Sequence, residues 1–153
     1  GLSLGTNIIA ESIPFIKKPQ AIVLSGPCII GQQYPVNNFL KPATHTHVLF
    51  AERASEQDVG SYAKEVMFGP DEEVTKSFIN GYYTTSGIFR SVFAKALNDQ
   101  KYNDEVELLK QYGSPILLIF GKDEKILYPE YLDNSGLNLW NNCVIRFQMP
   151  AIS

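Results

Sequence analysis

The sequence predicts an α/β protein with a parallel sheet, flanking helices and an inserted helical block. Two short apolar runs, at 21–26 and 115–120, are bounded by proline, glycine and charged residues, as is typical of buried strands. Between them, residues 55–98 carry apolar side chains at helical spacing. Strands separated by helices favour a parallel sheet, because parallel neighbours need a crossover connection. We therefore expect helices on both faces of the sheet.

The chain is expected to begin with a helix and a strand. Helical spacing of apolar residues predicts a helix over about 4–15, which ends near Pro14. The run Ala-Ile-Val-Leu-Ser-Gly at 21–26 predicts a strand buried on both faces. Residues 31–42 are rich in glutamine, asparagine and proline, which indicates a loop.

Three helices are predicted in the helical block. The first begins after Ser55, because Asp58 follows three residues later in a capping pattern, and it ends at Gly69. The second carries Pro70 in its first turn, where proline is tolerated. The third covers about 86–99 and presents an apolar face.

After this block the chain returns to sheet-forming residues. A short helix is predicted over 104–113, followed by a buried strand at 115–120 that ends at Gly121. A last strand is predicted over 142–149. The order of elements is that of a parallel sheet interrupted by one helical insertion.

Size and charge restrict the class of protein. The chain has 153 residues, which suits one hydrophobic core, and its net charge of −3 gives no basic surface for phosphates. Nucleic acid is therefore not an expected partner. Every apolar run is shorter than the roughly 20 residues that span a bilayer, so no membrane segment is expected. We expect a soluble protein of the cytoplasm.

The two cysteines, Cys28 and Cys143, lie beside apolar strand-like runs. Buried free thiols are favoured over a disulfide, since nothing else indicates a disulfide framework. No Cys-x-x-Cys pair is present to hold zinc, and we expect no metal.

The first five residues, Gly-Leu-Ser-Leu-Gly, match the pattern G-x-S-x-G directly before a predicted helix. In such a turn the serine has a strained backbone, and the glycines prevent collisions with neighbouring strands. The serine oxygen then lies at a helix N-terminus, which favours developing negative charge. The alternative is an ordinary Gly-Ser turn before a helix.

With the strand "PQAIVLSGP" and the segment "PILLIFGKDEKIL", this motif resembles the C-terminal portion of the α/β-hydrolase family, starting at its nucleophile elbow. The resemblance covers nearly the whole chain. It implies a hydrolase core at 1–30 and 101–153 and a helical cap, or lid, at 31–100. It also implies a serine hydrolase of the esterase or acyl-hydrolase kind, which needs no metal or organic cofactor and acts on a small-molecule acyl substrate.

The resemblance assigns candidate site residues. Ser3 matches the nucleophile, and the N–H of Leu4 matches the donor that stabilises the oxyanion. Asp123 falls where the family carries the acid that orients the catalytic histidine; its alternative role is a solvated turn acid. Cys28 and Ile126 are candidates for the substrate pocket.

The catalytic histidine has no match in the chain. The only histidines, His45 and His47, lie in the insertion, where a polar surface pair is favoured over a catalytic base. The resemblance places the base just beyond Ser153, so we expect this chain to be part of a longer protein. The alternative function is a non-catalytic domain that binds a ligand or a protein.

Two further expectations concern surfaces. The aromatic residues of the insertion either shape an apolar acyl pocket or pack the cap against the core; they are Phe50, Tyr62, Phe68, Phe78, Tyr82, Tyr83, Phe89 and Phe93. The sheet of this chain is expected to have unpaired apolar edges, which promote association. Expressed alone, the chain is expected to form a homo-oligomer.

Overall fold

A computed structural model describes residues 1–148, which divide into two compact units. The core unit contains Gly1–Leu40 and the chain from Asn103 onward. The insertion unit contains Lys41–Tyr102. Residues 31–40 thus lie in the core unit, whereas the sequence-based boundary assigned them to the insertion.

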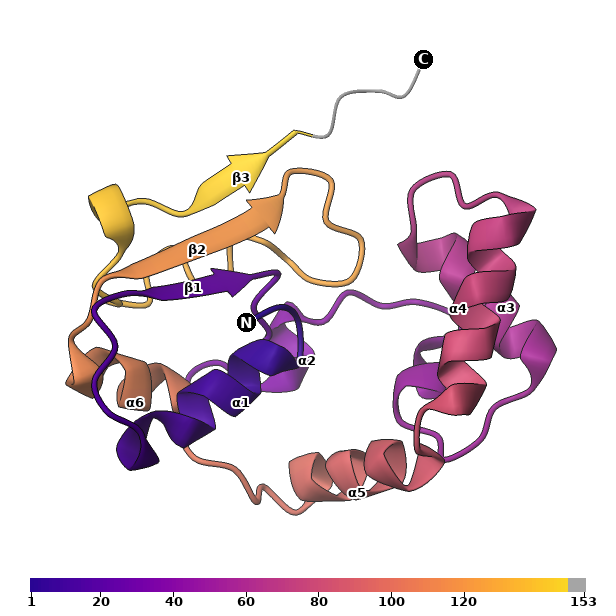
Figure 1. The fold of residues 1–153 in the computed structure, drawn as a ribbon, viewed down its shortest axis with the longest axis horizontal. Coiled ribbons are helices and arrows are strands. Elements are labelled where there is room, and N and C mark those ends of the chain that lie inside the picture. Colours follow the sequence, from indigo (N-terminus) through magenta and orange to yellow (C-terminus); the bar gives the residue numbers. More distant parts are fainter. Residues whose placement is uncertain (149–153) are drawn as a thin grey trace. The chain divides into compact units, whose positions relative to one another are not determined.

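The core unit is built on a parallel sheet of three strands in the order β1-β2-β3 (Figure 1). Its strands are β1 (Ile22–Ser25), β2 (Ile116–Gly121) and β3 (Ile145–Phe147). The α/β class and the parallel sheet are therefore confirmed. The last strand is shorter than predicted, and the predicted strand residue Met149 lies outside the described residues.

The first residues of the chain extend this sheet beside β1. The terminal amino group of Gly1 donates to the Val23 carbonyl at 2.7 Å, and the Ser25 N–H donates to the Gly1 carbonyl at 2.9 Å. Leu2 forms a parallel bridge with Ser25, which is paired in turn with Ile119. The chain therefore enters the turn at Ser3 from a strand-like position in register with β1 and β2.

Burial in the sheet alternates between its two faces. The buried strand residues are Ile22, Leu24, Ile116, Leu118 and Phe120. Val23, between two of them, is 49% exposed. Helices α1 and α6 lie on the same side of the sheet (Figure 1). The prediction of strands buried on both faces was wrong for β1, because the side chains that point away from the buried face are not covered.

The described part of the core unit contains three helices: α1 (Gly5–Ser12), α2 (Val36–Phe39) and α6 (Glu105–Tyr112). A 3-10 turn, Ile13–Phe15, continues α1, and a second one, Trp140–Asn142, precedes β3. Asp104 caps α6 by accepting a hydrogen bond from the Glu107 N–H, and Gly113 ends the helix with a positive φ of 69°. The predicted loop at 31–42 contains the single turn of α2.

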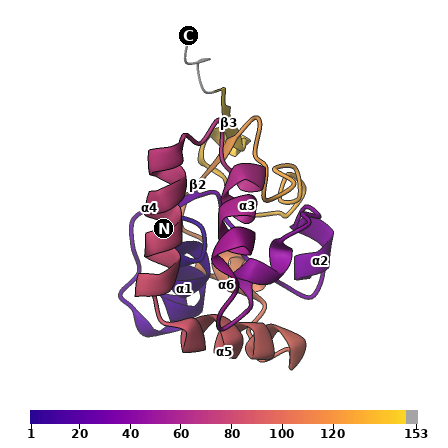
Figure 2. The ribbon, with the colours of Figure 1, turned by 90° about the vertical axis from the view of Figure 1, so that its right-hand side faces the viewer.

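The insertion unit contains a 3-10 turn, Thr46–Leu49, and the helices α3 (Glu56–Val66), α4 (Glu72–Thr84) and α5 (Gly87–Asn98). Helices α3 and α4 lie side by side (Figure 2). The Ser55 hydroxyl accepts from the Asp58 N–H at 3.1 Å, which confirms the predicted cap. Pro70 lies outside α4, contrary to prediction, because the carboxylate of Asp71 caps that helix.

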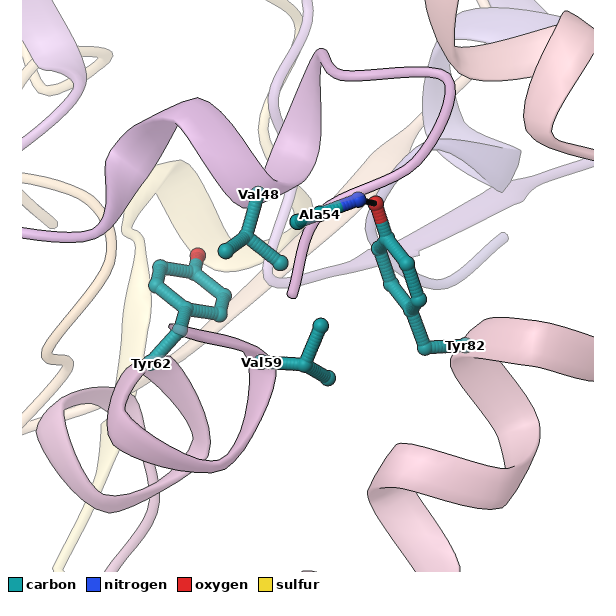
Figure 3. Packing of buried hydrophobic residues seen from close by; sticks show 5 residues of the cluster. All are labelled: Val48, Ala54, Val59, Tyr62 and Tyr82. Atoms are coloured by element: carbon teal, nitrogen blue, oxygen red, sulfur yellow. Dashed lines mark hydrogen bonds between the residues drawn. The ribbon is translucent and has the colours of Figure 1, made fainter. Parts of the chain in front are cut away.

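The insertion unit has its own hydrophobic core, formed by Val48, Ala54, Val59, Tyr62 and Tyr82 (Figure 3). The hydroxyl of Tyr82 accepts from the Ala54 N–H at 3.0 Å and donates to the Ala51 carbonyl at 3.2 Å. Two of the eight aromatics considered for an acyl pocket, Tyr62 and Tyr82, are therefore core residues of this unit.

Other apolar side chains of the insertion unit are exposed. On α5, Ile88 is 63% exposed and Val92 is 60% exposed, although their spacing predicted an apolar face. Among residues 1–148, the helices are too short or too polar to cross a lipid bilayer.

Candidate active site

The turn at residues 1–5 holds Ser3 in a strained backbone conformation. The φ of Ser3 is +48°, in the left-handed region that residues other than glycine rarely adopt. A Cβ atom on Gly1 would lie 2.5 Å from the Gly5 carbonyl oxygen, so a larger residue at position 1 requires the turn to shift. Gly5 itself has open space at its Cβ position. The first glycine is thus required by the start of α1, and not by a neighbouring strand as predicted.

Hydrogen bonds fix the backbone of this turn. The Ser3 N–H donates to the Ser25 carbonyl at 3.0 Å, which ties the turn to β1. The Ser3 carbonyl accepts from the Thr6 N–H at 2.8 Å and from the Thr6 hydroxyl at 2.6 Å. The Ser3 side chain itself is exposed. Within residues 1–148, the N–H of Leu4 at the start of α1 donates no hydrogen bond, so it is available to a negatively charged ligand.

Three candidate segments share the carboxyl edge of the sheet. Because Leu2, Ser25 and Ile119 are paired in one row, the residues that follow them emerge at the same edge. These segments carry Ser3, Cys28 and the turn after β2. Two strand spacings separate the strand of Ser3 from β2, which amounts to about 10 Å. Ligands of open parallel sheets bind at this edge.

The turn after β2 contains two neighbouring acids with different surroundings. Asp123 is exposed and, in the part of the chain that the structure describes, makes no hydrogen bond or ion pair. Glu124 is half-buried, and its Oε1 accepts from the Ile126 N–H at 2.8 Å. The sequence motif selects Asp123 and not Glu124. No sequence signal favours Glu124 over its neighbour, because the hydrogen bond from the Ile126 N–H depends on how the turn folds.

The loop that follows β1 carries the pocket candidate Cys28. The hydroxyl of Tyr131 donates to the carbonyls of Pro27 and Ile29, at 3.0 and 3.2 Å, and thereby holds the loop on both sides of Cys28. Burial raises the pKa of the Cys28 thiol to about 11, so it remains protonated at neutral pH. Both cysteines are free, but Cys143 is exposed, contrary to the expectation that it is buried.

A buried acid, Glu105, lies behind this loop and was not found from the sequence. It is 2% exposed, and its Oε2 accepts from the Asn7 side-chain amide and the Ile30 N–H, each at 2.8 Å. Burial raises its pKa to about 7, and the negative charges of Glu11 and Asp104 add to the shift. An acid in the first turn of a helix is usually a surface residue, so no sequence signal indicated this burial.

The substitution Glu105→Gln is expected to remove most of the pH dependence of stability between pH 5 and 8. The folded state binds this proton more tightly than the unfolded state does, so wild-type stability falls as pH rises from about 4.5 to 7. The loss is at most about 3 kcal/mol. The Asn7 amide and the Ile30 N–H both donate to Glu105 Oε2, and the amide oxygen of a glutamine can accept both hydrogen bonds in its place. Urea unfolding at pH 5 and pH 8 measures how the free energy of unfolding changes with pH. The same change in wild type and variant contradicts the expectation.

The two histidines are engaged within the insertion unit. His45 Nδ1 lies 2.6 Å from Glu65 Oε1, and His47 Nε2 lies 3.4 Å from Asp58 Oδ2. Among the described residues, no group of three or more histidine, cysteine or acidic side chains is arranged to hold a metal ion.

No protein-family model and no curated protein matches the chain. Solved structures do match it. The N-acyl homoserine lactonase AidH, complexed with N-butanoyl homoserine, has a TM-score of 0.83 at 21% identity, over 98% of this chain and 54% of that chain. A hydrolase from Oleispira antarctica has a TM-score of 0.66 at 19% identity, over 99% of this chain and 55% of that chain. The chain has the α/β-hydrolase fold and spans about half the length of these structures.

Proposed function

We propose that the complete protein containing this chain is a serine hydrolase of the esterase or acyl-hydrolase kind, with Ser3 as its nucleophile. The observation that carries the proposal is the strained turn, which presents an exposed serine at the N-terminus of α1 and at the carboxyl edge of the sheet. Strain of this kind persists where the surrounding structure fixes it, and it is concentrated at functional sites. The α/β-hydrolase fold supports the same reaction class.

In the proposed reaction, Ser3 Oγ attacks the carbonyl carbon of the substrate while a histidine beyond residue 153 accepts its proton. The Leu4 N–H donates to the oxyanion of the tetrahedral intermediate, an interaction whose loss typically raises the barrier by about 3 kcal/mol. The intermediate then expels the alcohol, which takes the proton from the histidine. Water, activated by the same histidine, releases the acyl group and restores the serine.

The acid that orients this histidine is proposed to come from the turn after β2. Asp123 is the candidate that the sequence motif selects. Glu124 is a second candidate, because a backbone hydrogen bond already holds its carboxylate. The distance of about 10 Å across two strand spacings leaves room for an imidazole between this turn and Ser3.

The proposed substrate is a small molecule with a carboxylic ester or a related acyl group. Cys28 and Ile126 follow the strands on this edge and are the proposed pocket residues, and the mechanism requires no metal or organic cofactor. AidH is described as an N-acyl homoserine lactonase. A lactone is a cyclic ester, so its chemistry falls within the proposed substrate class.

Labelling of the complete protein with a fluorophosphonate tests the proposal, because this reagent phosphonylates activated serines. We expect labelling of the wild type and of Ser12→Ala, a matched variant that removes a serine hydroxyl which, among the described residues, bonds the Ile8 carbonyl alone. We expect no labelling of Ser3→Ala. Equal labelling of all three proteins excludes Ser3 as the nucleophile, and no labelling of any favours the non-catalytic binding domain.

We also propose that the 153-residue chain, expressed alone, forms a homo-oligomer. In the described sheet, Leu2 lies at one edge and is 70% exposed, and Phe147 of the opposite edge strand is 57% exposed. Unpaired strand edges with apolar side chains favour pairing between chains. Multi-angle light scattering is expected to give at least the mass of a dimer, whereas a monomer at high concentration contradicts this expectation.

A further inference from the structure

Two connections join the insertion unit to the core unit, and a segment of each lies at the start of α6. The outgoing segment, residues 27–32, follows β1 in the part of the chain that leads to the insertion unit at Lys41. The returning segment, residues 103–107, begins where the chain re-enters the core unit at Asn103 and contains the first turn of α6. Because both segments belong to the core unit, their contacts determine how firmly that unit holds the two connections.

Hydrogen bonds join the two segments along residues 30–32. The Glu105 N–H donates to the Ile30 carbonyl at 2.9 Å, and the Ile30 N–H donates to Glu105 Oε2 at 2.8 Å. The Gln32 N–H donates to Asp104 Oδ2 at 2.9 Å. Between these residues, a Cβ atom on Gly31 would lie 2.5 Å from Asp104 Oδ1, the oxygen that caps α6. A side chain at position 31 would therefore push the segments apart or break the cap.

Helix α1, which packs beside α6, holds both segments as well (Figure 1). The Asn7 side-chain amide donates to the Cys28 carbonyl at 2.9 Å and to Glu105 Oε2 at 2.8 Å. One turn further along α1, Glu11 Oε1 accepts from the Asn103 N–H at 2.9 Å, and Glu11 Oε2 accepts from the Asn103 side-chain amide. Two side chains of one helix thus bind the outgoing segment at one residue and the returning segment at two.

The groups that face Glu105 are negative or neutral. Burial raises the pKa of Glu105 to about 7, and the negative charges of Glu11 and Asp104 raise it further, although its hydrogen bonds oppose the shift. The thiol of Cys28 and the hydroxyl of Tyr131 also face it, and both are neutral at pH 7. Because both donors reach Oε2, the proton of the neutral acid belongs on Oε1. Ionisation of Glu105 therefore places a third negative charge at this buried junction.

We propose that these contacts form a hinge clamp for the insertion unit: the outgoing and returning segments open together, and ionisation of Glu105 makes that opening easier. The pKa of Glu105 is about 7 in the closed clamp and 4.5 for an ordinary glutamate, so opening becomes more frequent as pH rises between these values. At higher pH the insertion unit is then freer to move on both connections at once. The clamp does not include Ser3, and its tests require no hydrolase activity.

The first test is hydrogen exchange of the complete protein, followed by mass spectrometry of peptides that cover each segment. Gly31→Ala forces a methyl group into filled space and is expected to speed exchange of both segments by the same factor, about tenfold or more. Gly81→Ala is the matched control, because nothing lies within 4 Å of its added Cβ, and it should leave both segments unchanged. Faster exchange in one segment only, or to the same extent in strand β2, overturns the proposal.

The second test follows the same peptides at pH 5 and pH 8, after correction for the intrinsic effect of pH on exchange. Opening of both segments is expected to increase more than about tenfold in wild type and less than about twofold in Glu105→Gln. Glu107→Gln, a matched change on the same helix, should keep the wild-type response. The same response in wild type and Glu105→Gln overturns the proposal. If Gly31→Ala does not fold, this comparison decides, and if Glu105→Gln does not fold, the first test decides.

Discussion

Replacement of Ser3 by alanine is expected to lower kcat for a soluble aryl ester by a factor of about 10⁴ or more, because no covalent acyl intermediate can form. The fold should be retained, since the Ser3 side chain is exposed and its backbone contacts do not involve the hydroxyl. Steady-state kinetics of the complete protein, with circular dichroism to verify folding, measure the effect. Ser12→Ala serves as the matched control, and activity above about a tenth of wild type in Ser3→Ala contradicts the role.

Ser3→Gly is a second test of the turn, because this substitution is expected to relieve backbone strain and to abolish activity. Glycine adopts the φ of +48° without the steric penalty of a side chain, so the variant should be more stable than Ser3→Ala by about 1 kcal/mol or less. It should be as inactive as Ser3→Ala. A variant that gains stability while it loses activity indicates that the strain serves the function of the turn.

The second large effect concerns the acid in the turn after β2. We expect Glu124→Gln to lower kcat by about 10³ to 10⁴, because an amide in place of the carboxylate does not hold the histidine in the useful tautomer. Asp123→Asn is the matched change at the neighbouring position and is expected to cost less than about tenfold. Side-by-side kinetics decide between the residues. If Asp123→Asn lowers kcat more than Glu124→Gln does, the role belongs to Asp123, the residue that the sequence motif selects.

The sequence patterns that predicted structural features correctly lie within short segments of the chain. The strained turn at Ser3 followed from five residues and the helix behind them. The Ser55 cap followed from a four-residue pattern, and the parallel direction of the strands followed from short apolar runs separated by helices. The turn and the cap are determined by residues close together in the sequence, and each strand is indicated by its own short run, so a local pattern is sufficient to predict them.

The features that the sequence did not predict depend on distant contacts. Glu105 is buried because Asn7 and the Ile30 N–H, which lie 98 and 75 positions away in the chain, donate to its carboxylate. No pattern near Glu105 contains this information. The exposure of Val23 was not predicted for the same reason. An apolar run predicts a strand but does not predict which face of the sheet is covered.

The candidate site was predicted only in part, because some of its features depend on contacts between distant segments. Ser3 belongs to a local motif, whereas the choice between Asp123 and Glu124 depends on how the turn folds back on the Ile126 N–H. The link from Glu105 to Cys28 through Asn7 required the positions of α1, α6 and the loop after β1 together.

The central claim is that Ser3 forms the covalent intermediate, and trapping that intermediate tests it most directly. The complete protein is mixed with a slowly deacylating aryl ester, quenched in acid, digested and analysed by mass spectrometry. We predict that the acyl mass is found on Ser3 and is absent from Ser3→Ala. An acyl mass on any other residue, at the same yield in wild type and Ser3→Ala, contradicts the claim.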